Sequence, residues 1–293
     1  TVNNRVRMKL KVFGFKPGII GSGQFNIDSP IVIGNIQTLY RNINKIRKEF
    51  GTLILDEMHH VSSPTFSRIL DTNYCRYKIG LSGTIERKDG KHVVFRDYFS
   101  PNVLKPPKEN FMAPVVNLFH SEIRFLDGAR IPWANRVTNL ASNEEYRHSV
   151  SMLAAAYAHR GHKVLVVSDR VAFLKRCAEL TGDKAICVTG EVLQEERERL
   201  INELRFGDKN VLYGTQAIFS EGISINELSC LILGTPINND PLLTQLIGRI
   251  IRKEEGKLTP VIIDIHLKGE TARRQASNRV GYYMKQGYQI KEL

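Results

Sequence analysis

The chain has 293 residues, 42% of them hydrophobic, which suffices for two domains of ordinary size and excludes wholesale disorder. Its formal net charge of +12 favours a polyanionic partner, most commonly nucleic acid, over the alternative of a basic protein without such a partner. The excess is concentrated in residues 1–50, where nine Lys or Arg stand against two acids.

Four cysteines lie far apart in the sequence and form no C-x-x-C pair. This spacing predicts neither a zinc site nor a disulfide framework, so a reducing compartment is the simplest interpretation. The sequence also lacks a run of about eighteen apolar residues that could span a membrane. We therefore expect no membrane partner.

Short apolar runs alternate with amphipathic stretches in the first half of the chain, as in a parallel sheet flanked by helices. The runs predict strands over 30–36, 52–56 and 77–83, and helices over 39–50 and 64–70. Four prolines between residues 101 and 120 indicate a connector, because proline lacks an amide donor and fixes φ. We place a domain boundary near residue 112.

The second half repeats this rhythm. It predicts helices over 144–160, 171–180, 193–206 and 241–251, and strands over 163–168, 185–190, 210–215, 230–235 and 259–265. The result is two α/β domains, 1–112 and 113–267, followed by a basic C-terminal tail or helix over 268–293. The Arg and Tyr side chains of this tail could stack on bases or could belong to a helix docked on the second domain.

The stretch LILDEMHH, residues 53–60, ends a predicted buried strand in two acids, Asp56 and Glu57. Ligands of open α/β sheets bind at the carboxyl ends of the strands, and a carboxylate pair suits Mg²⁺ that is also bound to phosphate oxygens. The second acid could polarise a water for attack on a phosphate. The alternative, in which Asp56 caps the next helix, explains one acid but not the pair.

Two further stretches carry polar side chains. QLIGRIIR places Gln245, Arg249 and Arg252 at helical spacings i, i+4 and i+7, with isoleucines and a leucine on the other side. Two guanidiniums on one face suit a phosphate, whereas the alternative is an exposed basic helix face. LSGT, residues 81–84, follows a predicted strand and could contact the acidic loop, although Ser-Gly-Thr is also common turn chemistry.

With DEMH, SGT and QLIGRIIR in this order, the chain resembles the superfamily 2 helicases, and within them the DExH group of DNA helicases that contains UvsW and XPB. Further matches lie at IGNIQTL (33–39), LSGTIERKDG (81–90), VLVVSDRVAFLKRC (164–177) and residues 188–225. The resemblance implies an α/β fold of two RecA-like domains, each with a parallel sheet flanked by helices. It also implies a cytoplasmic protein, in the host cytoplasm if a phage encodes it.

The resemblance implies roles for individual residues. Asp56 would hold Mg²⁺ through water, Glu57 would activate the attacking water, and His59 would couple the nucleotide site to Gln245. The other residues implied to contact ATP are Ser82, Thr84, Glu221, Gly222, Arg249 and Arg252. The residues that match contacts to the nucleic-acid backbone are Gln37, Thr38, Ser168, Arg170, Thr189 and Thr215.

The chain departs from the family pattern at two places. Ser224 stands where related proteins commonly have the Asp that contacts the ribose. In addition, GIIGSGQF, residues 18–25, has the glycine spacing of a phosphate loop but Gln24 and Phe25 in place of the lysine and the hydroxyl. We expect the true Walker A loop to lie upstream of Thr1, which leaves the first domain incomplete. Residues 1–293 alone should then hydrolyse ATP poorly or not at all.

We therefore expect an ATP-dependent DNA helicase or translocase that couples ATP hydrolysis to unwinding or branch migration of forked or branched DNA. Its partners would be single-stranded and branched DNA, and a monomer is compatible with the sequence. The alternatives are a nucleic-acid-binding relative that does not hydrolyse ATP, and an RNA helicase. Retention of Glu57, Arg249 and Arg252 favours the motor, because a clamp needs no acid that activates water.

Overall fold

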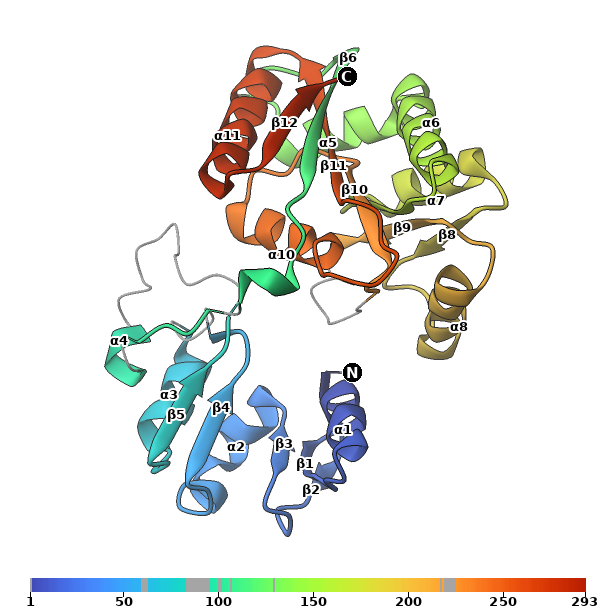
Figure 1. Cartoon of the computed structure of the whole chain (residues 1–293). Helices are drawn as coiled ribbons and strands as arrows, with labels where there is room; N and C mark the ends of the chain where they lie inside the picture. Colours follow the sequence, from blue (N-terminus) through green and yellow to red (C-terminus); the bar gives the residue numbers. More distant parts are fainter. Residues whose placement is uncertain are drawn as a thin grey trace. The chain divides into compact units, whose positions relative to one another are not determined.

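The computed structural model describes residues 2–58, 63–82, 95–99, 102–105, 107–128, 130–216, 218 and 225–293. The chain divides into two compact units, Thr1–Lys105 and Pro106–Leu293 (Figure 1). The predicted extents of 1–112, 113–267 and 268–293 stay predictions. In the structure, residues 268–293 lie within the second unit, where they supply a helix and a strand.

The first unit contains two small sheets and the helices beside them. Its elements are α1 (Val2–Val12), β1 (Gly18–Gly21), β2 (Gln24–Phe25), β3 (Val32–Gly34), α2 (Ile36–Ile46), β4 (Thr52–Leu55), α3 (Pro64–Thr72), β5 (Tyr77–Gly80) and α4 (Phe95–Tyr98). One sheet has the order β2-β1-β3, and the other consists of β4 and β5. Helices α2 and α3 bury Ile43 and Ile69 in a common apolar cluster with Ile20 of β1.

The glycines of GIIGSGQF belong to a β-hairpin. Strands β1 and β2 are antiparallel, with Gly21 opposite Gln24. The two residues between them, Ser22 and Gly23, have φ values of 52° and 78°. Positive φ at both central residues is the geometry of the tight turn that matches strand twist. This agrees with the expectation that the stretch is not a phosphate loop.

The sheet of β4 and β5 leaves one apolar face open to solvent. Ile54 and Ile79 face each other across the two parallel strands and are 60% and 46% exposed. Tyr77 and Leu81, two residues before and after Ile79, are also exposed. Parallel sheets ordinarily have both faces covered by helices. The first unit therefore carries apolar surface that its own described residues do not cover.

The second unit is built on a seven-stranded sheet. Its strands are β6 (Val115–Arg124), β7 (Lys163–Ser168), β8 (Ala185–Val188), β9 (Val211–Thr215), β10 (Leu228–Leu233), β11 (Val261–Lys268) and β12 (Gln289–Glu292). Its helices are η3 (Lys108–Asn110), α5 (Trp133–Ser142), α6 (Glu144–His159), α7 (Val171–Thr181), α8 (Gln194–Phe206), α10 (Asp240–Ile250) and α11 (Glu270–Gln286). The strand order is β12-β6-β11-β10-β7-β9-β8, and every neighbouring pair is parallel.

Both faces of this sheet are buried. In β7, Val164 and Val166 belong to the apolar cluster on one face, and Leu165 and Val167 belong to the cluster on the other. Helices α5, α6 and α7 contribute to the first cluster, whereas α8, α10 and the C-terminal part of α11 contribute to the second. A strand buried on both sides is apolar at successive residues, which is why the sequence predicts these strands well.

The predicted connector is wrong from Val115 onward. Strand β6 begins inside the stretch that the prolines mark as irregular and continues beyond it to Arg124. Val116 and Leu118 are buried two residues apart, and Ser121 and Ile123 are buried two residues apart with the phase shifted by one residue. Each half therefore has the period of a strand. Pro114 therefore precedes the strand and does not extend the connector.

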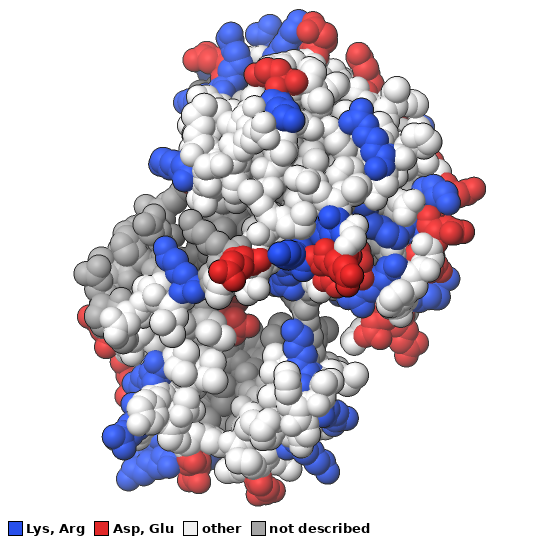
Figure 2. Space-filling view, viewed as in Figure 1, with Lys and Arg blue, Asp and Glu red and all other residues white. Residues whose placement is uncertain are grey.

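The C-terminal stretch docks on the second unit. Arg279 and Tyr283 of α11 are buried, and β12 pairs with β6 at the edge of the sheet. Of the two alternatives for this stretch, the docked helix is confirmed for these side chains. Lys and Arg side chains are exposed among acidic ones on the face shown in Figure 2. Within the part of the chain that the structure describes, no helix has the length and apolarity needed to cross a bilayer.

Buried thiols predict a loss of stability in alkaline solution. Burial raises the pKa of the Cys177 thiol to about 12 and that of the Cys187 thiol to about 11. An unfolded thiol has a pKa of about 8.5, so above that pH the unfolded chain releases protons that the folded chain keeps. The free energy of unfolding should fall as the pH rises from about 9 towards about 11. Urea unfolding across this range measures the fall, and Cys187→Ala should make it shallower; an unchanged slope would contradict the prediction.

Candidate functional site

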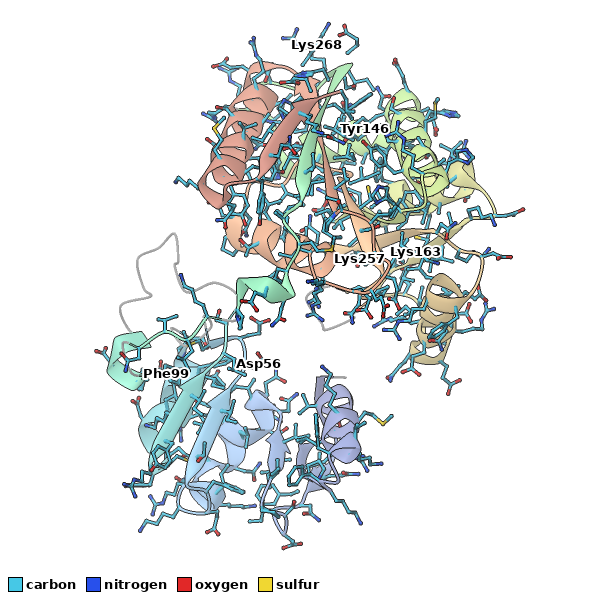
Figure 3. All side chains as sticks on the ribbon, in the orientation of Figure 1. Asp56, Phe99, Tyr146, Lys163, Lys257 and Lys268 are labelled. Carbon is cyan, nitrogen blue, oxygen red and sulfur yellow. The ribbon has the colours of Figure 1, made fainter. Side chains whose placement is uncertain are left out.

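Asp56 and Glu57 lie in a turn at the carboxyl ends of β4 and β5. The two strands are parallel, so their ends meet at one edge of the sheet. The Leu81 N–H donates to the Leu55 carbonyl at 2.8 Å, and the Met58 N–H donates to the Leu81 carbonyl at 2.9 Å. Asp56 is exposed at this edge, as Figure 3 shows. The backbone of both strands therefore fixes the acidic turn.

Glu57 has an unusual backbone conformation. Its φ of 53° lies in the left-handed region, and its N–H donates to Asp56 Oδ1 at 3.0 Å. Such a conformation costs of order 1–3 kcal/mol for a residue other than glycine and is concentrated at functional sites. Ser63 is the N-cap residue of α3, and residues 59–62, between Asp56 and that helix, lie outside the described residues. The alternative that Asp56 caps a helix therefore stays open. The strain of the backbone points to a functional requirement for Glu57.

Met58 packs against Gly80 beneath the acidic turn. Met58 is buried in a cluster with Leu55 and Leu70. A Cβ atom added at Gly80 would lie 2.2 Å from Met58 Sδ. Any larger residue at Gly80 would therefore displace the Met58 side chain from its present rotamer. Gly80 was not predicted from the sequence, because its role depends on Met58, which is more than twenty positions away.

The structure places three of the predicted nucleotide-site residues at this edge. Ser82 is half-buried and follows Leu81, directly beside the turn of Asp56 and Glu57. Four further residues that the resemblance implies for the nucleotide site lie outside the described residues: His59, Thr84, Glu221 and Gly222. Their roles stay predictions.

The start of α2 holds Gln37 and Thr38 in the first unit. Asn35 is the N-cap, and its Oδ1 accepts from the Gln37 N–H at 3.0 Å. The Asn35 N–H in turn donates to the Ile20 carbonyl at 2.8 Å, which ties the cap to β1. Gln37 is exposed and Thr38 is half-buried. A helix start of this kind attracts phosphates, because its free N–H groups carry partial positive charge.

A row of hydroxyl side chains lies at the carboxyl ends of four neighbouring strands in the second unit. We call Thr235, Ser168, Thr215 and Thr189, which follow or end β10, β7, β9 and β8 in spatial order, the hydroxyl row. Ser168 is paired with Thr215 across the two strands, and Ser168 Oγ lies 3.0 Å from Thr235 Oγ1. Thr235 was not predicted from the sequence. The polar Gly-Thr that follows the apolar run of β10 was the available signal.

Arg170 is engaged with its own unit. Its N–H donates to Ser168 Oγ at 3.1 Å. Its guanidinium donates to the Asp169 carboxylate and to the Ala134 carbonyl, both at 3.1 Å. These contacts hold the side chain beside the hydroxyl row and leave it half-buried. A contact between Arg170 and nucleic acid stays a prediction.

Helix α10 carries Gln245 and Arg249, which are both half-buried. Asn239 caps its start by accepting the Leu242 N–H, and its buried apolar residues are Leu243, Leu246, Ile247 and Ile250. The prediction that Arg252 shares the helical face is wrong. The helix ends at Ile250, and Arg252 forms an antiparallel bridge with Phe111.

Residues 110–112 are joined to the chain that leaves α10. The Met112 N–H donates to the Ile251 carbonyl at 2.7 Å, and the Lys253 N–H donates to the Asn110 carbonyl at 3.0 Å. Lys257 Nζ donates to the Arg252 carbonyl at 2.8 Å. Burial lowers the pKa of Lys257 to about 8. These contacts fix the backbone of Arg252 independently of the helix.

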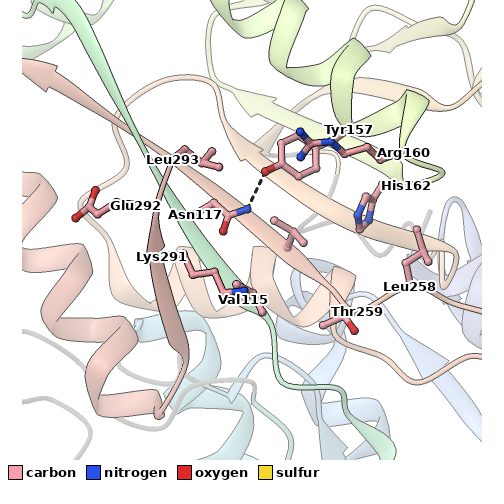
Figure 4. A pocket seen from close by; sticks show the side chains of 11 residues that line it. Val115, Asn117, Tyr157, Arg160, His162, Leu258, Thr259, Lys291, Glu292 and Leu293 are labelled. Carbon is pink, nitrogen blue, oxygen red and sulfur yellow. Dashed lines mark hydrogen bonds between the residues drawn. The ribbon is translucent and has the colours of Figure 1, made fainter.

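A pocket of about 510 Å³ lies at the other end of the sheet (Figure 4). Val115 and Val261, which begin β6 and β11, line it. Asn117 Nδ2 donates to the Tyr157 hydroxyl at 2.7 Å, and the Arg160 guanidinium lies 4.9 Å from the centroid of the Tyr157 ring. The pocket is at the amino ends of the strands, whereas the hydroxyl row is at their carboxyl ends.

Two stretches of the chain match known protein families. Residues 146–254 match the helicase conserved C-terminal domain, and residues 5–87 match the type III restriction enzyme, res subunit. Both matches support the resemblance of the chain to the superfamily 2 helicases. The chain has the predicted α/β fold of RecA-like domains. The seven-stranded sheet and the pair of β4 and β5 are parallel, whereas β2 adds an antiparallel strand to the other sheet of the first unit.

The relatives of the chain are longer than the chain itself. It is 43% identical over 281 residues to "Probable helicase D10" of Escherichia phage T5, covering 95% of this chain and 62% of that protein. It is 23% identical to "ATP-dependent DNA helicase uvsW" of Enterobacteria phage T4, covering 92% and 56%. A fragment structure of a putative HsdR subunit of a type I restriction enzyme from Vibrio vulnificus YJ016 has a TM-score of 0.71 at 18% identity, covering 94% and 54%. The chain therefore spans less than two thirds of each of these proteins.

The contact between Met58 and Gly80 predicts the effect of a methyl group. Gly80→Ala should lower the free energy of unfolding by about 1–3 kcal/mol, because the new Cβ forces the Met58 side chain out of its position. Urea unfolding measures this loss. Gly51→Ala is the matched control, since no atom lies within 4 Å of a Cβ at Gly51. In a Met58→Ala background, Gly80→Ala should lower the free energy of unfolding by less than it does in the wild type. The same loss in both backgrounds would refute the contact.

Proposed function

We propose that this chain is part of an ATP-dependent helicase or translocase that acts on DNA, with Asp56 and Glu57 at the phosphates of ATP. The observation that carries the proposal is the acidic turn. It presents two adjacent carboxylates at the carboxyl ends of parallel strands, with Glu57 held at a φ of 53°. Ligands of open α/β sheets bind at such ends. The names of the phage relatives, both helicases, support the same conclusion.

The residues of the turn fit Mg²⁺ with a bound triphosphate. Asp56 is exposed, and a carboxylate is among the hard oxygen ligands that Mg²⁺ accepts together with water and phosphate oxygens. Asp56 would hold the ion through water, and the bound ion would neutralise charge on the phosphates. Glu57 accepts the proton of the attacking water in this proposal. Its restrained backbone fixes the direction in which the Glu57 side chain leaves the turn.

The second unit supplies positive charge in this proposal. Arg249, on the half-buried side of α10, contacts the γ-phosphate, as does Arg252 from the segment that follows the helix. Gln245, one turn before Arg249, lies on the nucleotide side of the same helix. The remaining proposed contacts to the nucleotide or its coupling come from His59, Ser82, Thr84, Glu221 and Gly222.

We also propose that a phosphate loop from another part of the complete protein completes the first domain. The open apolar face of β4 and β5, with Ile54 and Ile79 exposed, supports this. Parallel strands in a finished sheet are covered on both faces. Further strands or helices that cover Ile54 and Ile79 would bring the loop to the edge where Asp56 lies.

The nucleic-acid partner in this proposal is DNA. The exposed Gln37 and the half-buried Thr38 at the start of α2, and the half-buried Thr215 of the hydroxyl row, offer neutral hydrogen-bond donors, which contact phosphates without reading sequence. Ser168 and Thr189 are buried in this structure, and their contacts to nucleic acid stay predictions. The net charge of +12 supports binding to a polyanion. The T4 relative is named a DNA helicase, and unwinding or branch migration of forked DNA is the finer form of the proposal.

Replacing Glu57 tests the proposed catalytic role. In the complete protein, Glu57→Gln should abolish ATP turnover, because the amide cannot accept a proton from water. Binding of single-stranded DNA should survive, since the change lies outside the proposed nucleic-acid contacts. A phosphate-release assay and fluorescence anisotropy measure the two properties on the same preparation. Undiminished turnover in the variant would remove Glu57 from its proposed role.

Removing one hydroxyl tests the proposed nucleic-acid contact. Thr215→Val preserves the side-chain shape and should weaken single-stranded DNA binding by roughly fivefold, the equivalent of one net hydrogen bond of about 1 kcal/mol. Anisotropy titrations at a fixed salt concentration measure the affinity. Thr181→Val is the control, because that hydroxyl bonds Tyr213 within the unit. Equal affinities for the wild type and Thr215→Val would exclude this contact.

A further inference from the structure

A buried ion pair joins β11 and α11 in the second unit. Asp264 lies in β11 with none of its surface exposed, and Arg279 of α11 is 6% exposed. Arg279 Nε lies 2.9 Å from Asp264 Oδ2, and Nη2 lies 2.6 Å from Oδ1. This is the two-pronged geometry in which a guanidinium grips a carboxylate. The pair has a fixed direction as well as a position.

The same guanidinium reaches the segment that leads to α10. Arg279 Nη1 donates to the Ile237 carbonyl at 3.4 Å. Ile237 is buried in residues 234–239, which connect the end of β10 to the start of α10. A single side chain, oriented by Asp264, therefore holds the backbone just before the helix that carries Gln245 and Arg249.

A second contact from α11 reaches α10 itself. The Tyr282 hydroxyl lies 2.8 Å from Thr244 Oγ1, and Thr244 Oγ1 also bonds the Asp240 carbonyl at 2.8 Å. Thr244 directly precedes Gln245. Arg279 and Tyr282, three residues apart in α11, thus contact the Ile237 carbonyl ahead of α10 and the Thr244 hydroxyl within α10.

The other end of the connecting segment is tied to the hydroxyl row. The Gly234 N–H donates to the Val167 carbonyl at 3.0 Å. Thr235 Oγ1 then lies 3.0 Å from Ser168 Oγ. Residues 234–239 therefore run from a side chain in the hydroxyl row to the cap of α10, and Arg279 holds them midway.

We propose that Arg279 is a positioning residue, which with Asp264 and Tyr282 fixes the path from the hydroxyl row to α10 so that Arg249 meets the nucleotide in one orientation. This rests on the proposed function of Arg249. A buried ion pair gives no more stability than apolar side chains of the same volume, whereas its directional bonds can specify a single arrangement. Specification of the α10 geometry is the role that the contacts of Arg279 fit.

Two matched tyrosine variants test the positioning of α10 in the chain of 293 residues. Tyr282→Phe removes the bond to Thr244, whereas Tyr213→Phe removes an equivalent bond to Thr181, which lies 2.6 Å away on α7. Amide hydrogen exchange followed by mass spectrometry should be faster over residues 234–250 in Tyr282→Phe and unchanged there in Tyr213→Phe. Equal exchange over 234–250 in the two variants would overturn the proposal.

Removing the ion pair extends this test without leaving a lone buried charge. The double variant Asp264→Asn/Arg279→Gln is neutral at both positions. The glutamine side chain is shorter than that of Arg279 and no longer reaches the Ile237 carbonyl. Faster exchange should be confined to residues 234–250 and α11. An even increase across the whole second unit would show a purely structural role and overturn the proposal.

The complete protein tests the consequence for catalysis. The double variant should lower kcat for DNA-stimulated ATP hydrolysis by about tenfold, with little change in the KM for ATP. The reason is that Arg249 acts mainly on the reacting phosphate, so its displacement slows the reaction more than it weakens ATP binding. Arg279→Lys, which keeps the charge, should have a kcat between those of the double variant and the wild type. Tyr213→Phe should have the kcat of the wild type. Wild-type rates in the double variant would overturn the positioning role. A wild type without ATP turnover would instead refute the proposed function, and the exchange data would still decide whether Arg279 holds α10.

Discussion

Every neighbouring pair of strands in the seven-stranded sheet is parallel, and this alignment decides where polar side chains can gather. Parallel strands place all their carboxyl ends at one edge, and helices bury both faces. The hydroxyl row lies at that edge, and so does the start of the segment that leads to α10. The parallel pair of β4 and β5 brings Asp56 and Ser82 together in the first unit in the same way.

The strands of the second unit were predictable where both faces are buried. Strands β7, β9 and β10 are continuous apolar runs, because helices cover both of their faces. Strand β6 was missed, since Asn117, His120 and Glu122 interrupt its apolar residues and prolines precede it. The end of α10 was also missed. Ile251 continues the helical pattern, but the backbone leaves the helix to pair with Phe111, a partner that no local pattern reveals.

The candidate site divides along the same line. Asp56 and Ser82 follow apolar runs, so their position at strand ends could be predicted from the sequence alone. Gly80 and Thr235 could not, because each acts through a residue far away in the chain: Met58 for the first and Ser168 for the second. The pairing of Asp264 with Arg279 was hidden for the same reason. An acid within an apolar run is recognisable, but its partner is known only once α11 is folded against β11.

The bridge between Phe111 and Arg252 has a mechanical consequence. The chain that leads into the second unit is fastened to the exit of α10 by the N–H groups of Met112 and Lys253 before it reaches β6. Tension applied to the backbone ahead of residue 107 is therefore borne first at the end of that helix, and only afterwards by the sheet. Such tension would therefore act on the segment that carries Arg252 before it acts on the sheet.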